Sequence, residues 1–233
     1  MEGVLTAAEW EALALSLRVA LVAVLVDMPF AFLAALVLAR CRFPGKPLVD
    51  GLVHLPLVLP PVVIGWLLLV AFAPGGPVGG WLWRTLGVTL LFRWTGAALA
   101  AAIMALPLMV RAIRLSLEAV DPRLEEAART LGAGPWATFR RVTLPLCAPG
   151  VLAGAVLGFA RSLGEFGATI TFVSNIPGET QTLPLAIYAA LQVPGGEATV
   201  WRLALVAVVL SLLALLASEA LARRQGGKRA HVL

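Results

Sequence analysis

Apolar residues dominate five stretches of the chain, and each stretch is close to the length that a helix needs to cross a bilayer. A spanning helix requires about 20 predominantly apolar residues, and the stretches cover residues 19–39, 51–73, 94–110, 142–160 and 203–218. Asp27 is the only charged residue in the first of them. We therefore predict an all-α integral membrane protein with five transmembrane helices.

Two apolar segments do not fit a straight spanning helix. The second stretch contains Pro56, Pro60 and Pro61, which lack the backbone N–H of a regular helix and should break it. A broken helix at membrane depth is tolerated where it lines a cavity or packs against protein, so the break is either an interfacial kink or part of a gate. Residues 183–192 are apolar but too few for a span, which predicts a short re-entrant or surface helix.

The composition points to a membrane protein. Hydrophobic residues make up 60% and charged residues 13% of the 233 residues, whereas soluble domains average about 45–50% and about 25%. A chain of this size cannot bury so much apolar surface inside itself. A soluble globular protein is therefore excluded.

The net charge of +5 follows the topology and does not indicate a nucleic-acid partner. Thirteen of the 18 Lys and Arg residues follow the first, third and fifth apolar stretches, within residues 40–46, 111–141 and 223–229. Cytoplasmic loops carry an excess of Lys and Arg. We therefore expect a multi-pass protein of the cytoplasmic (inner) membrane, with the N-terminus outside, the C-terminus cytoplasmic and residues 226–233 as a basic cytoplasmic tail.

Residues 121–142 form the most distinctive polar segment. Asp121 is a good helix N-cap and Pro122 a good first helical residue. An apolar stripe with helical spacing follows, Gly132 ends that helix, and Gly134 and Pro135 begin a second one. The stripe consists of Leu124, Ala127, Ala128 and Leu131, and the second helix carries Trp136 and Phe139. Two short amphipathic helices with exposed aromatic residues are suited to docking on another protein.

The same segment resembles a family signature. Residues 126–145, EAARTLGAGPWATFRRVTLP, are similar to the EAA loop of bacterial ABC importer permeases, with Val142 in place of the commoner isoleucine. Residues 54–63, 107–115 and 160–180 resemble the molybdate permease branch of that family. The resemblance implies a type I ABC importer permease fold over residues 10–225, with residues 121–142 as the cytoplasmic coupling loop.

The resemblance also implies partners and a function. It implies a homodimeric pore in the lipid bilayer, two cytoplasmic ATPase subunits, and a periplasmic or tethered protein that delivers molybdate. Contact with the ATPase would involve Leu124, Glu126, Ala127, Ala128, Leu131, Gly132, Trp136 and Phe139. The sequence has no GxxxxGK[ST] loop, so ATP and Mg²⁺ would be bound by the partner ATPase and no cofactor by this chain.

Polar and small residues around the fourth apolar stretch are candidates for the translocation path or gate. Arg161 and Glu165 are four residues apart and can pair on one helical face, either as a structural ion pair or as part of the path. Hydroxyl and amide groups that could replace the hydration of an oxyanion follow in Thr169, Thr171, Ser174 and Asn175. Gly154 and Gly158 form a small-xxx-small pair, for which we expect a homodimer interface.

Two alternatives remain open from the sequence. The first is the same machine with another oxyanion as cargo, such as tungstate or sulfate. The second is an intramembrane enzyme, which would need a nucleophile with its base, or metal ligands, within the spans. His54 and His231 are the only histidines and no HExxH motif occurs, so we predict no catalytic residue and no metal site.

Overall fold

All regular secondary structure among the described residues is helical. The computed structural model describes the backbone of residues 5–229 and the side chains of residues 5–217. The helices are α1 (Ala7–Arg40), α2 (Lys46–Val58), α3 (Pro61–Phe72), α4 (Gly79–Leu86), α5 (Trp94–Glu118), α6 (Pro122–Thr130), α7 (Pro135–Thr138), the π-helix η1 (Phe139–Thr143), α8 (Leu144–Leu163), α9 (Gly167–Val173), α10 (Leu183–Leu191) and α11 (Glu197–Arg229). Part of the basic tail predicted at 226–233, together with His231, lies outside the described residues.

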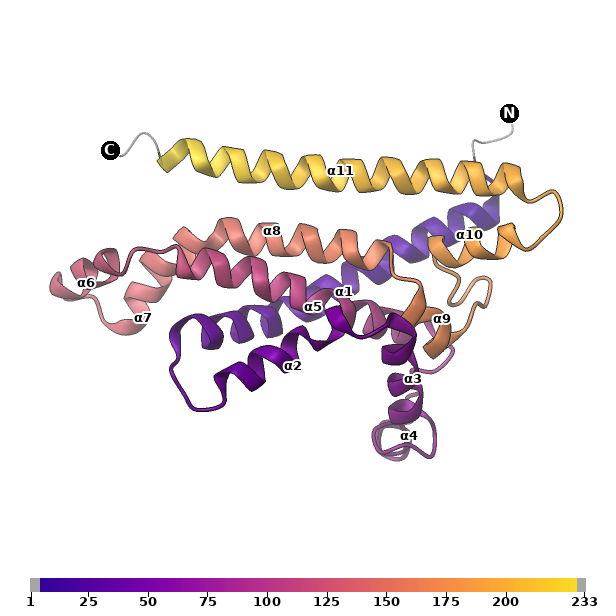
Figure 1. Ribbon diagram of the computed structural model, residues 1–233, viewed down its shortest axis with the longest axis horizontal. Coiled ribbons are helices and arrows are strands. Elements are labelled where there is room, and N and C mark those ends of the chain that lie inside the picture. Colours follow the sequence, from indigo (N-terminus) through magenta and orange to yellow (C-terminus); the bar gives the residue numbers. More distant parts are fainter. Residues whose placement is uncertain (1–4, 230–233) are drawn as a thin grey trace.

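The long helices define the shape of the molecule. In Figure 1, α1, α5, α8 and α11 run along the long axis, with α6 and α7 at one end and α9 and α10 towards the other. Helix α11 ends on the side where α6 and α7 lie, and α1 begins on the opposite side. Helices α3 and α4 project away from the bundle, roughly across its axis.

The prediction of five spans agrees with the structure when α2 and α3 are counted together as one broken span. In the described part of the chain, four helices are long and apolar enough to cross a membrane: Ala7–Arg40, Trp94–Glu118, Pro135–Leu163 and Glu197–Ala217. Helices α2 and α3 together make a fifth candidate, bent by 109°. The bend lies at Leu59 and Pro60, as expected from a proline cluster that removes successive backbone donors.

Small side chains allow α1, α5 and α8 to approach closely. Ala31 and Ala35 of α1 are fully buried, as are Met109 and Ile113 of α5 in the same apolar cluster. A Cβ atom added to Gly158 of α8 would lie 2.6 Å from Met109 Sδ. The tight packing of these three helices explains why the core depends on alanine and glycine.

This packing corrects the expectation for Gly154 and Gly158. A Cβ on Gly154 would lie 3.2 Å from Ile113 Cγ1, and one on Gly158 would also lie 3.5 Å from Val24 Cγ2. Gly154 therefore faces α5 and Gly158 faces α5 and α1 of the same chain, and the expected use of this face as a homodimer interface is wrong. A small-xxx-small spacing predicts a close helix contact but does not identify the partner helix.

A substitution at this contact should destabilise the single chain. We expect Gly158→Leu to lower the melting temperature in detergent by several degrees, because overpacking a full core site costs about 1–3 kcal/mol. Gly51→Leu is the matched control, since a Cβ on Gly51 of α2 meets no atom within 4 Å. Equal melting temperatures for the two variants, measured by light scattering or tryptophan fluorescence, would contradict the packing role.

Helix α1 begins well before the apolar stretch that predicted it. Thr6 and Glu9 form a reciprocal capping box, and the Glu9 carboxylate also pairs with Arg202 of α11 at 2.6 Å between Glu9 Oε1 and Arg202 Nη2. These polar contacts extend α1 to 34 residues. Hydrophobicity alone could not reveal this extension.

Asp27 lies in the middle of α1 on its buried face. Only 5% of the residue is exposed, and its Oδ2 atom has no hydrogen-bond partner among the described residues. Val24 and Ala31, one turn away on either side, belong to the cluster formed with α5 and α8. The acid therefore faces protein and not lipid, as expected for a charged residue type within a span.

The short elements between the spans are only partly those expected. Helix α10 confirms the predicted short helix at 183–192 and lies against α1 and α11. Helices α4 and α9 were not predicted, because residues 74–80 and 167–175 read as glycine-rich or polar turns. In α9, Glu165 supplies the capping acceptor that the local pattern left unidentified.

Candidate functional site

The segment 121–142 contains the two short helices that its sequence predicts. Asp121 caps α6 by accepting a hydrogen bond at Oδ1 from the Arg123 N–H at 2.9 Å. Gly132 has φ +88°, the left-handed conformation expected where one helix stops and another begins. Pro135 is the first residue of α7. Local capping chemistry therefore determines this two-helix element, which we call the coupling element (residues 121–143).

One side of the coupling element is an unoccupied surface in this chain. Leu131 is 89% exposed, Trp136 71% and Leu124 49%. Glu126 and Ala127 are also exposed, Ala128 is half-buried, and the Glu126 carboxylate forms no hydrogen bond or ion pair with any described residue. These three large apolar side chains are exposed together on one short element outside the spans, and grouped exposed apolar residues are suited to contact with a partner protein.

Phe139 departs from the expectation. It does not lie on the exposed side: its ring stacks on Trp136 at 5.6 Å and meets Phe32 of α1 edge-on at 6.1 Å between centroids. The second helix also does not end at Val142 but continues through η1 into α8, so that residues 135–163 form one 29-residue helix. Phe139 therefore joins the coupling element to a spanning helix.

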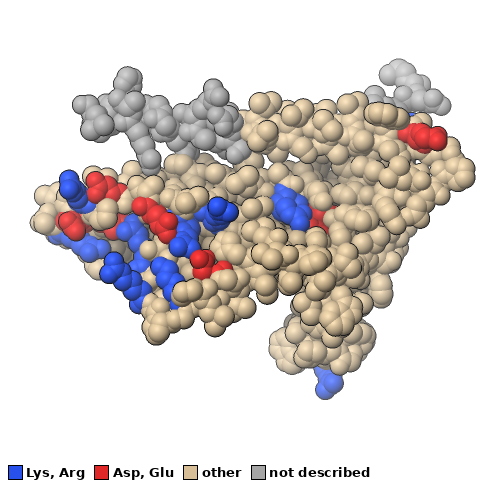
Figure 2. Space-filling model, in the orientation of Figure 1, with Lys and Arg blue, Asp and Glu red and all other residues tan. Residues whose placement is uncertain are grey.

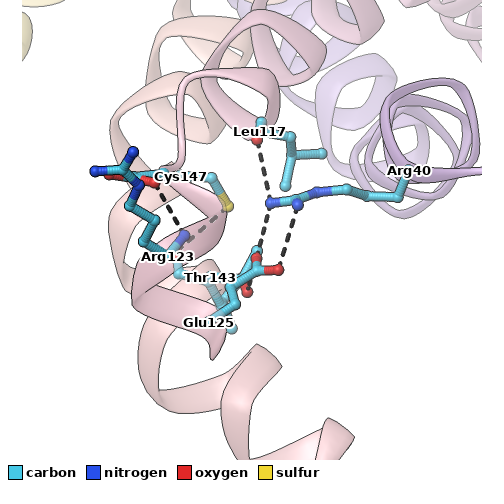
Figure 3. A network of polar contacts seen from close by, with 8 residues as sticks. Arg40, Leu117, Arg123, Glu125, Thr143 and Cys147 are labelled. Carbon is cyan, nitrogen blue, oxygen red and sulfur yellow. Dashed lines mark hydrogen bonds and ion pairs between the residues drawn. The ribbon is translucent and has the colours of Figure 1, made fainter. Parts of the chain in front are cut away.

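A network of polar contacts lies on the inner side of the coupling element (Figure 3). Arg40 Nη2 donates to Glu125 Oε1 at 2.8 Å and Arg40 Nη1 to Glu125 Oε2 at 3.3 Å. Thr143 of η1 donates its hydroxyl to the same Oε1 atom at 2.7 Å. Sequence reasoning missed Glu125 because its partner Arg40 is 85 residues away, beyond the range of any local pattern.

Basic residues surround the coupling element. In Figure 2, Lys and Arg side chains gather at the end of the molecule that carries α6 and α7, while most of the visible surface over α8, α3 and the described part of α11 carries no charge. Arg129 of α6 and Arg140 and Arg141 of η1 flank the exposed apolar positions in the sequence. This clustering agrees with the asymmetry of basic residues along the chain.

A second polar cluster links α2 to α5 near the same end. Arg114 Nη1 lies 3.0 Å from Asp50 Oδ1, and Arg114 Nε lies 2.8 Å from Glu118 Oε1. His54 Nδ1 lies 3.3 Å from the same Asp50 atom. These residues, with Arg111 and Leu115, line a cavity of about 300 Å³. His54 therefore contacts Asp50 within its own helix α2, and Asp50 makes the link to α5.

The predicted pair of Arg161 and Glu165 forms near the end of α8. Arg161 Nη1 lies 2.7 Å from Glu165 Oε2, and the Glu165 side chain is almost completely buried. The other carboxylate oxygen accepts a hydrogen bond from the Ala168 N–H at 2.8 Å. Glu165 therefore fixes the start of α9 as well as neutralising Arg161.

The four polar candidates that follow do not line one common surface. Thr169 is 1% exposed within α9, whereas Thr171 is half-buried and donates its hydroxyl to the Gly167 carbonyl at 2.8 Å. Ser174 is exposed, with φ 63° at the end of α9. Asn175 is half-buried and donates to the Leu185 carbonyl at 3.4 Å. In this conformation, Thr169 is not accessible to a solute.

Helix α9 nevertheless packs directly on the broken second span. A Cβ atom on Gly65 of α3 would lie 2.6 Å from the Ala168 carbonyl oxygen, and one on Gly167 would lie 2.8 Å from Pro61 Cβ. Two segments that the sequence marked as irregular therefore meet. The start of α9 and the second half of the broken span therefore pack against each other.

Residues 16–227 match the family described as binding-protein-dependent transport system inner membrane components, and the chain belongs to this family. It is therefore a membrane component of a transport system and not an enzyme. Among the described side chains, those of residues 5–217, no group of three or more His, Cys, Asp or Glu residues could hold a metal ion.

Individual proteins and solved structures that are similar to the chain give a more specific comparison than the family alone. Over 220 residues, the chain is 58% identical to the molybdenum transport system permease protein ModB of Escherichia coli K12, covering 94% of this chain and 96% of the relative. The ModB protein of Haemophilus influenzae is similar to the same extent. The crystal structure of a bacterial ABC transporter involved in alginate import superposes with a TM-score of 0.74 at 22% identity, covering 94% of this chain and 80% of the other. The fold is that of a type I ABC importer permease.

Proposed function

We propose that this chain is the permease subunit of an ATP-driven importer that moves molybdate across the cytoplasmic membrane by alternating access. The observation that carries the proposal is the 58% identity, over nearly the whole length of both chains, to permeases named for molybdenum transport. The exposed side of the coupling element supports it, because such a surface is what an importer needs for its ATPase.

The proposed assembly contains a second copy of this chain, two cytoplasmic ATPase subunits that bind ATP and Mg²⁺, and a periplasmic or tethered molybdate-binding protein. The bias of basic residues supports an orientation with the N-terminus outside and the C-terminus cytoplasmic. The coupling element then faces the ATPase, with Leu124, Leu131 and Trp136 as apolar anchors and Glu126 as a charged contact.

In this mechanism the free energy comes from the ATPase, and the chain converts it into movement. ATP binding would bring the two ATPases together and displace the attached coupling elements. Because α7, η1 and α8 form one helix, the displacement reaches the spans directly. The contact between α8, α9 and α3 would then open or close the path, which we assign to the region of Arg161, Glu165, Thr169, Thr171, Ser174 and Asn175.

Uptake by proteoliposomes tests this function. The permease, reconstituted with its partner ATPase and a molybdate-binding protein, should take up radiolabelled molybdate only when ATP is available to the ATPase. Tungstate and sulfate serve as competitors at matched concentrations. Uptake of sulfate in preference to molybdate would assign the chain to another oxyanion, and ATP-independent uptake would contradict an ABC importer.

A further inference from the structure

The contact between Glu125 and Arg40 has the geometry of a specific link and not of a loose surface ion pair. The two guanidinium nitrogens donate to the two carboxylate oxygens in parallel, at 2.8 and 3.3 Å. Bidentate pairs of this kind fix orientation as well as distance. Only 13% of the Glu125 side chain is exposed, so solvent weakens the interaction less than it would on an open surface.

The link joins four elements at one point. Arg40 is the last residue of α1, and its Nη2 atom also donates to the Leu117 carbonyl near the end of α5 at 3.3 Å. Thr143 brings in η1, where it is buried and donates to Glu125. Figure 3 shows Arg40 extending from α1 towards the Glu125 carboxylate and the Leu117 carbonyl. The end of α1, η1 at the start of the α8 span, and α6 therefore meet at the Glu125 carboxylate, and Arg40 adds the end of α5 through the Leu117 carbonyl.

Helix α6 has little else that holds it to the bundle. None of its residues is buried, and Leu124 and Ala127 of its apolar stripe are exposed. The π-helical turn η1 contacts α6. Such turns are often found at functional positions within longer helices. A force applied to the exposed side of α6 can therefore reach the ends of α1 and α5 through the Glu125 side chain, in addition to the route along the continuous helix of α7, η1 and α8.

We propose that Glu125 is a positioning residue that transmits movement of the coupling element to α1, α5 and α8 through Arg40 and Thr143. The inference rests on the proposed function. Glu125 and its neighbour Glu126 then have separate tasks: Glu126 contacts the ATPase, and Glu125 connects α6 to the spans.

The two adjacent glutamates provide a matched experiment. Glu125→Gln, Arg40→Met, the double variant and Glu126→Gln are each purified with the ATPase and reconstituted with the binding protein. Glu11→Gln is the silent control, because Glu11 is exposed on α1 far from the coupling element along the helix. The measurements are the amount of ATPase that co-purifies, the rate of ATP hydrolysis, and the molybdate taken up per ATP hydrolysed.

We expect Glu125→Gln to retain the ATPase and to lower molybdate uptake per ATP about tenfold, the loss expected when one charge-assisted link is weakened. Arg40→Met should have the same effect, and the double variant should be no worse than either single variant, because both remove one interaction. Glu126→Gln should instead reduce the amount of bound ATPase. A general loss of stability would lower all three measurements together.

Two results would overturn the inference. The first is a wild-type value of molybdate uptake per ATP in Glu125→Gln. The second is a double variant whose loss of uptake per ATP equals the product of the losses in Glu125→Gln and Arg40→Met. The proposed function fails in a different way, namely if the wild-type assembly hydrolyses ATP in response to its binding protein but takes up no molybdate. In that case, hydrolysis stimulated by the binding protein still tests Glu125. Loss of this stimulation in Glu125→Gln with the ATPase still bound would support the inference, and unchanged stimulation would overturn it.

Discussion

Gly132→Val should abolish most molybdate uptake while leaving insertion and folding of the permease intact. Gly132 has φ +88° and a Cβ atom there would meet nothing within 4 Å, so the cost is conformational and not steric. A left-handed backbone costs an L-residue about 1–2 kcal/mol, which lowers the population of the native turn about 5- to 30-fold. The turn sets the angle between α6 and α7, and therefore the shape of the surface offered to the ATPase.

Gly132→Asn is the matched control, since asparagine adopts the left-handed conformation more readily than other non-glycine residues. We expect Gly132→Asn to retain most uptake and most co-purifying ATPase, and Gly132→Val to lose both. Equal activity of the valine and asparagine variants would show that the conformation of this turn is not important for coupling.

Glu165→Ala should have the second large effect, on stability and uptake together. The change leaves Arg161 without its partner and removes the acceptor for the Ala168 N–H, so α9 loses its fixed start. Breaking a buried ion pair costs about 3–5 kcal/mol, and because Arg161 is partly exposed we expect about 2 kcal/mol here.

The double variant Arg161→Met with Glu165→Gln distinguishes two roles of the Arg161–Glu165 ion pair: a purely structural role, and a direct role in the translocation path. Glutamine can still accept the hydrogen bond from Ala168, and methionine removes the unpaired charge. We expect thermal stability and molybdate uptake both to recover in this variant. Recovery of stability without uptake would show that the charges act on the passing anion or on the gate.

The sequence was most informative where the determining chemistry is local. The spans follow from hydrophobicity, the break of the second span from Pro60 and Pro61, and the turn after α6 from Gly132, because each depends on one residue type and its immediate neighbours. The Arg161–Glu165 pair was also predictable, since residues four apart meet on one helical face.

The remaining features depend on contacts between distant segments. The Glu125–Arg40 link joins α6 to α1, and no local pattern distinguishes Glu125 from Glu126. Gly154 and Gly158 were assigned to the wrong partner for the same reason, because glycine spacing indicates close approach without naming the neighbouring helix. Phe139 was expected on the docking surface, and its burial against Phe32 depends on how α1 is placed.

The buried acid at Asp27 has a consequence for biogenesis. An aspartate at the centre of a helix costs about 2.5–3.5 kcal/mol on insertion scales, whereas each Leu, Val or Phe contributes about −0.3 to −0.6 kcal/mol. The many apolar residues between 19 and 39 therefore let α1 enter the bilayer on its own during synthesis. Its carboxyl group gains protein surroundings only when α5 and α8 emerge from the ribosome, so the nascent chain acquires a membrane anchor first and its packed interior much later.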